Sequence, residues 1–266
     1  MANDLDFITD NMTWSFSRLN SFYSNCKYEW YMHYIECLPA VGGFFGEFGG
    51  YCHKILEKYL KGELGVFDLA PYYEEHYSEE VVSSPPPNNY VDLGESYYNK
   101  GLAYFESFAD YWEDNYEIIG VEKEIHFEID GKPFIGFIDL LLRNKETGAI
   151  KIVDHKSASI KMLKNGNVSK SDADHFLEFK RQLYLYSNAI KEEFPGVPIE
   201  ALEWNMFKQG DTITIPYDDK EYLEALWWAS DTIKAIEEEE EWPSLADKFY
   251  CWNLCSMREN ACPYKP

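Results

Sequence analysis

Two apolar runs that end in charged residues constrain the fold of this chain more than any other feature. They lie within the segment from Gly136 to Ser159, which reads GFIDLLLRNKETGAIKIVDHKSAS. The first run carries the lone acid Asp139, and the second ends in Asp154, His155 and Lys156. A Gly-containing turn between the runs predicts two neighbouring strands. Because Asp and Lys are depleted in strands and costly to bury unpaired, their presence at the mouth of a buried hairpin indicates a metal site.

The length of the chain predicts one domain over residues 1–266. We expect a mainly helical part over 1–117 containing His53, a sheet with a following helix over 118–216, and a helix with a cysteine-rich tail over 217–266. No apolar run approaches the roughly 20 residues that span a bilayer. Acids also occupy the N-terminal region, where a secretory signal would be basic. The sequence therefore predicts a cytoplasmic protein without a membrane partner.

The net charge of -23 argues against a protein that simply coats nucleic acid, because phosphate contacts require Lys and Arg. The charge is unevenly spread, since basic and acidic residues are nearly equal in number between Val121 and Gln182. Within that stretch, the segment Ser157 to Lys170 holds lysines and no acid. We expect a flexible basic loop there, which either contacts a phosphate backbone beside the predicted site or is an ordinary solvated loop.

Periodicity predicts an α/β fold with a central mixed sheet. Strands are expected at 118–129, 134–143, 149–154, 199–207 and 212–216, with helices at 14–34, 47–60, 93–116, 172–193 and 218–240. Ser15 or Ser17 would cap the first helix, and Asp130-Gly131 is a hairpin turn signal. Three prolines between Ser83 and Tyr90 exclude a helix through that segment.

Five short motifs occur in one order along the chain. They are Ser-x-Ser followed by Cys26, Gly49-x3-His53, Gly136-x2-Asp139, Asp154-x-Lys156 and Gln182-x3-Tyr186. This order resembles the PD-(D/E)XK nuclease superfamily, and within it the RecB-like exonucleases that include AddB and CRISPR-associated enzymes. The resemblance implies a single nuclease domain with a restriction-endonuclease-like core, an N-terminal helical insertion and a cysteine-rich C-terminal tail.

The residue types agree with the roles that the resemblance implies. Asp139 and Asp154 would offer the oxygen ligands that Mg²⁺ or Mn²⁺ prefers, with an imidazole from His53 and the backbone carbonyl of His155. Lys156 would orient the attacking water or hold the scissile phosphate. The alternatives are a polar strand end for the acids and the lysine, and a hydrogen-bonded core residue for His53.

Gln182 and Tyr186 lie one helical turn apart on one face. They resemble the motif that holds DNA and the active-site lysine in this superfamily, and plain helix packing is the alternative. Glu124, on the strand before the hairpin, is an accessory acid or a partner for a basic side chain. We do not predict it as a metal ligand.

The C-terminal tail holds Cys251, Cys255 and Cys262 within twelve residues. In some RecB-like proteins, three such cysteines and one near the first helix bind a [4Fe-4S] cluster that joins the two ends of the chain. Cys26 has the matching position. Four thiolates would suit either this cluster or tetrahedral zinc, and the absence of any metal is a third alternative.

The leading hypothesis from the sequence is a metal-dependent DNA nuclease, expected to act as an exonuclease on ends or single strands. The acidic regions outside the motifs suggest a second hypothesis, a nuclease-fold module that binds DNA or a basic recombination or annealing partner without catalysis. A third is an acidic mimic of DNA, which leaves the lysine and the cysteines unexplained.

Overall fold

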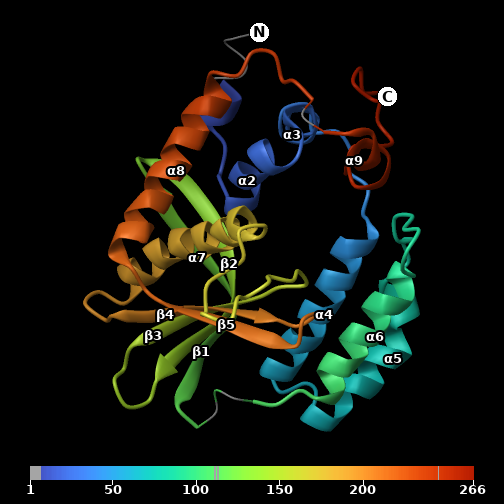
Figure 1. Ribbon diagram of the computed structural model, residues 1–266. Coiled ribbons are helices and arrows are strands. Elements are labelled where there is room, and N and C mark those ends of the chain that lie inside the picture. The colour runs from blue at the N-terminus through green and yellow to red at the C-terminus, as the bar shows by residue number, and fades with distance from the viewer. Residues whose placement is uncertain (1–6, 111, 113, 245) are drawn as a thin grey trace. The chain divides into compact units, whose positions relative to one another are not determined.

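The computed structural model describes residues 7–110, 112, 114–244 and 246–266 (Figure 1). Its helices are α2 (Phe16–Ser24), α3 (Lys27–Tyr34), α4 (Phe44–Leu60), the 3₁₀ helix η1 (Val66–Asp68), α5 (Leu69–Glu80), α6 (Leu93–Glu106), α7 (Ala173–Glu193), α8 (Asp219–Glu237) and α9 (Lys248–Asn253). Its strands are β1 (Tyr116–Ile129), β2 (Lys132–Asn144), β3 (Ile150–His155), β4 (Ile199–Met206) and β5 (Asp211–Pro216).

The strands form one mixed sheet in the order β1-β2-β3-β4-β5. β3 pairs antiparallel with β2 and parallel with β4, and β4 pairs antiparallel with β5. The parallel pair requires a crossover, which is α7, and this helix packs on β3 and β4. All six residues of β3 are buried, which explains its nearly continuous apolar run. The predicted α/β class with a central mixed sheet is confirmed.

The chain divides into two compact units. One comprises residues 1–43, 126–136 and 219–266, and the other comprises 44–125 and 137–218. All the residues predicted for the metal site lie in the second unit, and all four cysteines predicted for the cluster lie in the first. Each predicted site therefore lies within a single unit.

Helix α4 carries His53 and is held by an aromatic core. Its inner face supplies Phe48, Tyr51 and Ile55 to a buried cluster that also contains Tyr73 of α5 and Phe105 of α6. α5 packs on both α4 and α6, as Figure 1 shows. This packing fixes the direction in which α4 presents His53.

The N-terminal helix predicted over 14–34 is wrong in one respect, because it is two helices. Ser15 caps α2 as predicted, with its Oγ accepting a hydrogen bond from the Arg18 amide. The chain then leaves the helix at Asn25, and Cys26 has an extended backbone as the N-cap of α3. The break places the Cys26 thiol at the start of a helix, where it is buried.

Other helices also differ from the sequence predictions. The sequence does not predict α5, since only Leu69 and Tyr73 of its twelve residues are buried and its apolar stripe is weak. α6 ends at Glu106 and does not continue to 116. The Ser107 hydroxyl donates to the carbonyl of Ala103, a local bond that competes with further helix formation.

The hairpin turn between β1 and β2 has the backbone that its sequence signal predicts. Asp130 and Gly131, between β1 and β2, both have positive φ, at 49° and 76°. Positive φ at both central residues is the requirement of a type I′ hairpin, which explains the Asp-Gly pair. The basic loop after Lys156, which the sequence predicts to be flexible, has internal structure, because Met162 forms a β-bridge with Val168.

Candidate active site and cysteine pocket

The strands β2 and β3 bring the two predicted acids together. Leu140 pairs with Val153 in antiparallel register, so Asp139 and Asp154 occupy the next positions along their strands. The backbone N–H of His155 donates to Oδ2 of Asp139 over 2.6 Å. This bond fixes the Asp139 carboxylate against the end of β3. The sequence prediction that both acids lie at one end of the hairpin agrees with this geometry.

Lys156 directly follows the last residue of β3 and turns its ammonium back onto the acid. Its Nζ lies 2.8 Å from Oδ2 of Asp154 and donates to Oε1 of Gln182, also over 2.8 Å. The Gln182 side chain in turn donates to Oδ1 of Asp154 over 3.1 Å. The three side chains thus form a closed arrangement between β3 and α7.

Burial strengthens this arrangement. Asp154 is only 3% exposed, and this burial raises the pKa of its carboxyl, while the Lys156 ammonium opposes the rise. The Lys156 ammonium also lies over the ring of Phe179, 5.2 Å from its centroid. A lysine held by an acid, an amide and a ring keeps one orientation at the end of the strand.

Tyr186 lies one turn beyond Gln182 on α7, as the sequence predicted. Nε2 of Gln182 is 3.4 Å from the Tyr186 hydroxyl. Tyr186 is buried, and burial raises the pKa of its phenol. The hydroxyl is therefore a neutral group that supports Gln182.

A second set of side chains surrounds Asp139. Nδ1 of His53 lies 3.5 Å from Oδ2 of Asp139. One ligand atom each of His53, Asp139 and Glu122 lie within 4.8 Å of one another. The combination of an imidazole and two carboxylates is a donor set that fits Mn²⁺ or Mg²⁺. Asp154 is not in this set, and its carboxylate contacts Lys156 and Gln182.

Glu122 is absent from the sequence prediction, which names Glu124 as the accessory acid. Glu124 is exposed, whereas Glu122 is half-buried beside Asp139. The backbone of Glu122 has φ 46°, a left-handed conformation that interrupts the regular alternation of β1 and redirects the side chain. Burial, followed by the repulsion of Asp139, raises the pKa of Glu122 to about 7. In the sequence, the only sign of this ligand is that acids occupy positions 122 and 124, which a strand places on the same face.

The imidazole of His155 is buried, with 2% of the residue exposed. Its Nδ1 lies 3.0 Å from Nδ2 of Asn205, and burial lowers its pKa to about 3. The ring of His53 lies edge-on to it, with 5.7 Å between centroids. The side chain of His155 is thus a neutral part of the packing, and the sequence prediction for this residue concerned its backbone carbonyl.

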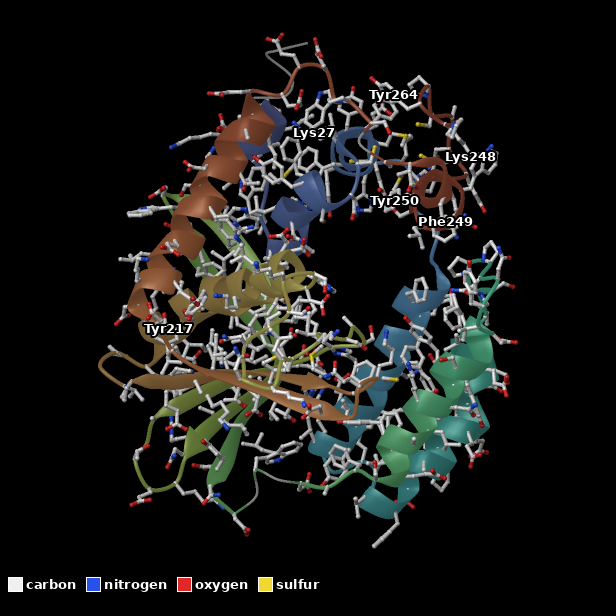
Figure 2. The ribbon with its side chains drawn as sticks, in the orientation of Figure 1. Lys27, Tyr217, Lys248, Phe249, Tyr250 and Tyr264 are labelled. Carbon is white, nitrogen blue, oxygen red and sulfur yellow. The ribbon has the colours of Figure 1, made fainter. Side chains whose placement is uncertain are left out.

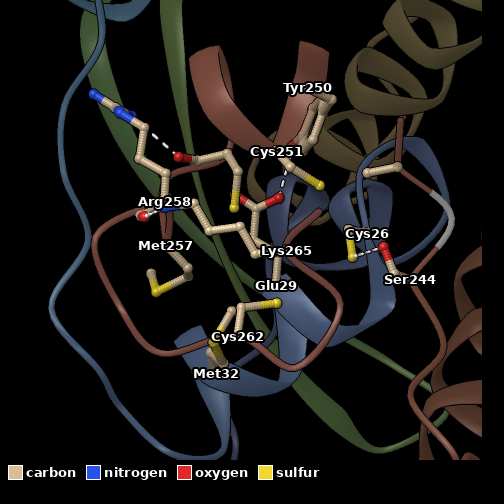
Figure 3. Close-up of a pocket in the computed structure, with 12 residues that line it drawn as sticks. Cys26, Glu29, Met32, Ser244, Tyr250, Cys251, Met257, Arg258, Cys262 and Lys265 are labelled. Atoms are coloured by element: carbon tan, nitrogen blue, oxygen red, sulfur yellow. Dashed lines mark hydrogen bonds between the residues drawn. The ribbon is translucent and has the colours of Figure 1, made fainter. Parts of the chain in front are cut away.

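The four cysteines predicted to act together line one pocket of the first unit (Figure 3). Cys26 begins α3, Cys251 lies in α9, and Cys255 and Cys262 follow in the tail. Cys37 is exposed and Cys52 is buried in the aromatic core of the other unit. The sequence gives neither cysteine a partner in the C-terminal triplet and predicts both as small buried residues, which is right for Cys52 and wrong for Cys37.

Glu29 of α3 joins the tail to the N-terminal helices beside these thiols. Its carboxylate accepts hydrogen bonds from the Tyr250 hydroxyl over 2.6 Å and from the Ser256 amide over 2.7 Å. Figure 2 shows the Tyr250 and Tyr264 side chains of the C-terminal tail in this unit. Burial, together with the nearby Glu29 carboxylate, raises the pKa of the Cys255 thiol to about 12, so without a metal this thiol is protonated at neutral pH.

The family model of the PD-(D/E)XK nuclease superfamily matches residues 13–266. The chain belongs to this superfamily. Among solved structures, the structure of this nuclease is similar to that of a "putative exonuclease" from Eubacterium rectale, with a TM-score of 0.55 and 12% identity over 98% of this chain and 92% of the other. At that identity the likeness shows a shared fold. No curated protein matches the sequence.

Membership of the superfamily confirms that part of the resemblance found in the sequence and makes the chain a nuclease by family, while the RecB-like branch stays a prediction. Enzymes of this superfamily use divalent metal ions, and the set of His53, Glu122 and Asp139 supplies a place for one. Within the described residues, no helix of this nuclease is long and apolar enough to cross a membrane.

Proposed function

We propose that this protein is a divalent-metal-dependent deoxyribonuclease of the RecB-like branch, acting as an exonuclease on DNA ends or single strands. The observation that carries the proposal is the position of Lys156. Its ammonium is held by Asp154 and Gln182 at the end of β3, next to the residue whose amide binds Asp139. Beyond its ion pair with Asp154, a lysine held in this way at the end of the strand can act on a water molecule or a phosphate in the site.

His53, Glu122, Asp139 and Asp154 would hold the Mg²⁺ or Mn²⁺ ion, with the backbone carbonyl of His155. The ion would lower the pKa of a water molecule and stabilise negative charge on the phosphate. Lys156 would orient that water or bind a non-bridging phosphate oxygen. Gln182 accepts a hydrogen bond from the Lys156 ammonium and donates one to Asp154, so it holds the two side chains together.

The loop of 157–170 supports a DNA substrate. Lys161, Lys164 and Lys170 are exposed on it, and it follows Lys156 directly. The amide of Lys161 donates to the Asp172 carboxylate, which anchors the loop at the start of α7. Exposed lysines on an anchored loop can contact successive phosphates with little loss of entropy. The exonuclease mode is supported by the name of the structural neighbour from Eubacterium rectale.

The test is degradation of single- and double-stranded DNA labelled at the 5′ or the 3′ end, with Mn²⁺, Mg²⁺ or EDTA. The proposal predicts end-dependent release of nucleotides with a metal ion, none with EDTA, and none for Asp154→Ala. DNA binding without cleavage under every condition would instead support the binding module, and cleavage by Asp154→Ala would show that the site is wrongly assigned. The same assay with RNA tests the substrate class.

We also propose that Cys26, Cys251, Cys255 and Cys262 bind a [4Fe-4S] cluster. The pocket supplies four thiols from the two ends of the chain. A tetrahedral zinc ion would bring their sulfur atoms to within about 4 Å of one another. The resemblance to RecB-like proteins in which four such cysteines bind a cluster favours [4Fe-4S] over zinc.

Anaerobic purification followed by visible spectroscopy and by iron and zinc analysis tests this second proposal. A brown protein with about four iron atoms per chain is the expected result. A colourless protein with one zinc ion would show that the thiols bind zinc and not a cluster. A stable metal-free protein would exclude both metals.

A further inference from the structure

Asn205, near the end of β4, contacts the segment Asp154 to Lys156 in two ways. Its backbone carbonyl accepts a hydrogen bond from the Lys156 amide over 2.8 Å. Its side-chain Nδ2 lies 3.0 Å from Nδ1 of His155 and donates to the Tyr104 hydroxyl over 2.7 Å. Asn205 is 4% exposed, so water does not compete for these bonds.

The side-chain amide of Asn205 determines which nitrogen of the His155 ring carries the proton. An amide nitrogen only donates, and its two hydrogens are directed at Tyr104 and at Nδ1 of His155. Nδ1 is therefore an acceptor, and the proton of the neutral ring resides on Nε2. Within the described residues, Nε2 has no hydrogen-bond partner. The bond from Asn205 is thus the polar contact that orients this ring.

The orientation of His155 matters because its peptide groups belong to the proposed site. Its N–H donates to the Asp139 carboxylate, and its carbonyl is a proposed metal ligand. His155 also lies opposite Asn205 in the parallel pairing of β3 with β4. The His155 ring also packs edge-on against His53, a proposed metal ligand, so a rotation of the unanchored ring would disturb His53.

We propose that Asn205 is a positioning residue for the metal site. It holds the His155 ring from one side and the Lys156 amide from the other, and its bond to Tyr104 ties this contact to α6. The inference rests on the proposed function. Groups that orient metal ligands without touching the metal commonly change metal affinity by 10- to 100-fold when they are removed.

The variant Asn205→Leu removes the amide, keeps the backbone bond to Lys156 and approximately keeps the volume. The matched control is Asn144→Leu, which removes an amide at the opposite end of the sheet, where Asn144 bonds to Glu200. Mn²⁺ affinity is measured from the electron paramagnetic resonance signal of the free ion, and cleavage gives kcat and KM. The ¹⁵N shifts of the His155 ring report which nitrogen carries the proton.

We expect Asn205→Leu to bind Mn²⁺ at least about tenfold more weakly. The kcat of this variant should fall while its KM for DNA stays within about twofold. The ¹⁵N shift of His155 Nδ1 should move away from the value of a hydrogen-bonded acceptor. Asn144→Leu should lose stability and keep both the Mn²⁺ affinity and the ring shifts of the parent. If Asn205→Leu does not fold, the smaller change Asn205→Ser is measured in the same way.

Unchanged Mn²⁺ affinity and unchanged ring shifts in the Asn205 variant would overturn the inference. So would equal losses of affinity in the Asn205 and Asn144 variants, since these would reflect stability alone. A parent protein that binds no Mn²⁺ and cleaves nothing would refute the proposed function. In that case the ring shifts still show whether or not Asn205 sets the proton position on His155.

Discussion

Nζ of Lys156 lies 2.8 Å from Oδ2 of Asp154, two residues earlier in the chain. The acid is buried, so an uncompensated charge there would be costly. The lysine offsets part of that cost and is itself kept in one orientation by Gln182. The pair therefore has a structural role as well as its proposed catalytic one, and experiments must separate the two.

Replacing Lys156 by Met should reduce kcat by about 10²- to 10⁴-fold, the usual contribution of a positioned proton-transfer group. The metal ligands remain, so Mn²⁺ affinity should change little. Single-turnover cleavage together with Mn²⁺ titration measures both quantities. Lys145→Met, in the turn after β2, is the control and should cleave like the parent. Parental cleavage by Lys156→Met would remove the lysine from the mechanism.

Changing Lys161, Lys164 and Lys170 together to Gln should weaken DNA binding without lowering kcat. For every phosphate that the loop no longer binds, the plot of log binding constant against log salt concentration should become shallower by about 0.7 for single strands or 0.9 for duplex DNA. Binding measured by fluorescence anisotropy across a salt series gives this slope. Lys220→Gln on α8 is the control. An unchanged slope in the triple variant would mean that the loop is only a solvated surface.

Cys255→Ser should remove the proposed cluster and lower the thermal midpoint of the unit that contains it, because only three of the four ligands remain. Cleavage per folded molecule should persist, since the four thiols lie in a different unit from Lys156. Cys37→Ser, at an exposed cysteine outside the pocket, should leave iron content and stability unchanged. Visible absorbance and differential scanning calorimetry compare the variants. Equal iron content in Cys255→Ser and the parent would argue against the ligand set.

The part of the site that could be predicted lies on regular elements. Asp139 and Asp154 follow from a strand period of two and a hairpin register, and Gln182 and Tyr186 follow from a helical period. These rules concern neighbours on one element or on paired strands. They could not predict that Asn205 reaches His155. That contact depends on the parallel pairing of β3 with β4, two strands that are separated in the sequence by the whole of α7.

Glu122 shows the other limit of sequence reasoning. The alternation of β1 treats positions 122 and 124 as equivalent, and only the positive φ at Glu122 distinguishes them. A left-handed Glu has no sequence signature, because its cost is offset by surrounding structure. The break at Cys26 is similar, since helix-spaced aromatics continue through it and the extended residue is visible only in the fold.

Glu122 also predicts how the stability of the metal-free protein depends on pH. Its ordinary pKa of 4.5 rises to about 7 in the fold, so between these values the folded state binds more protons than the unfolded state. The contribution of Glu122 to the free energy of unfolding therefore falls as pH rises from about 4.5 to 7, and levels off above 7. Denaturant titrations in EDTA should show that Glu122→Gln removes this part of the decline, whereas Glu124→Gln, at the exposed neighbour, retains it. The same decline in both variants would mean that Asp154 or another acid, and not Glu122, holds the extra proton.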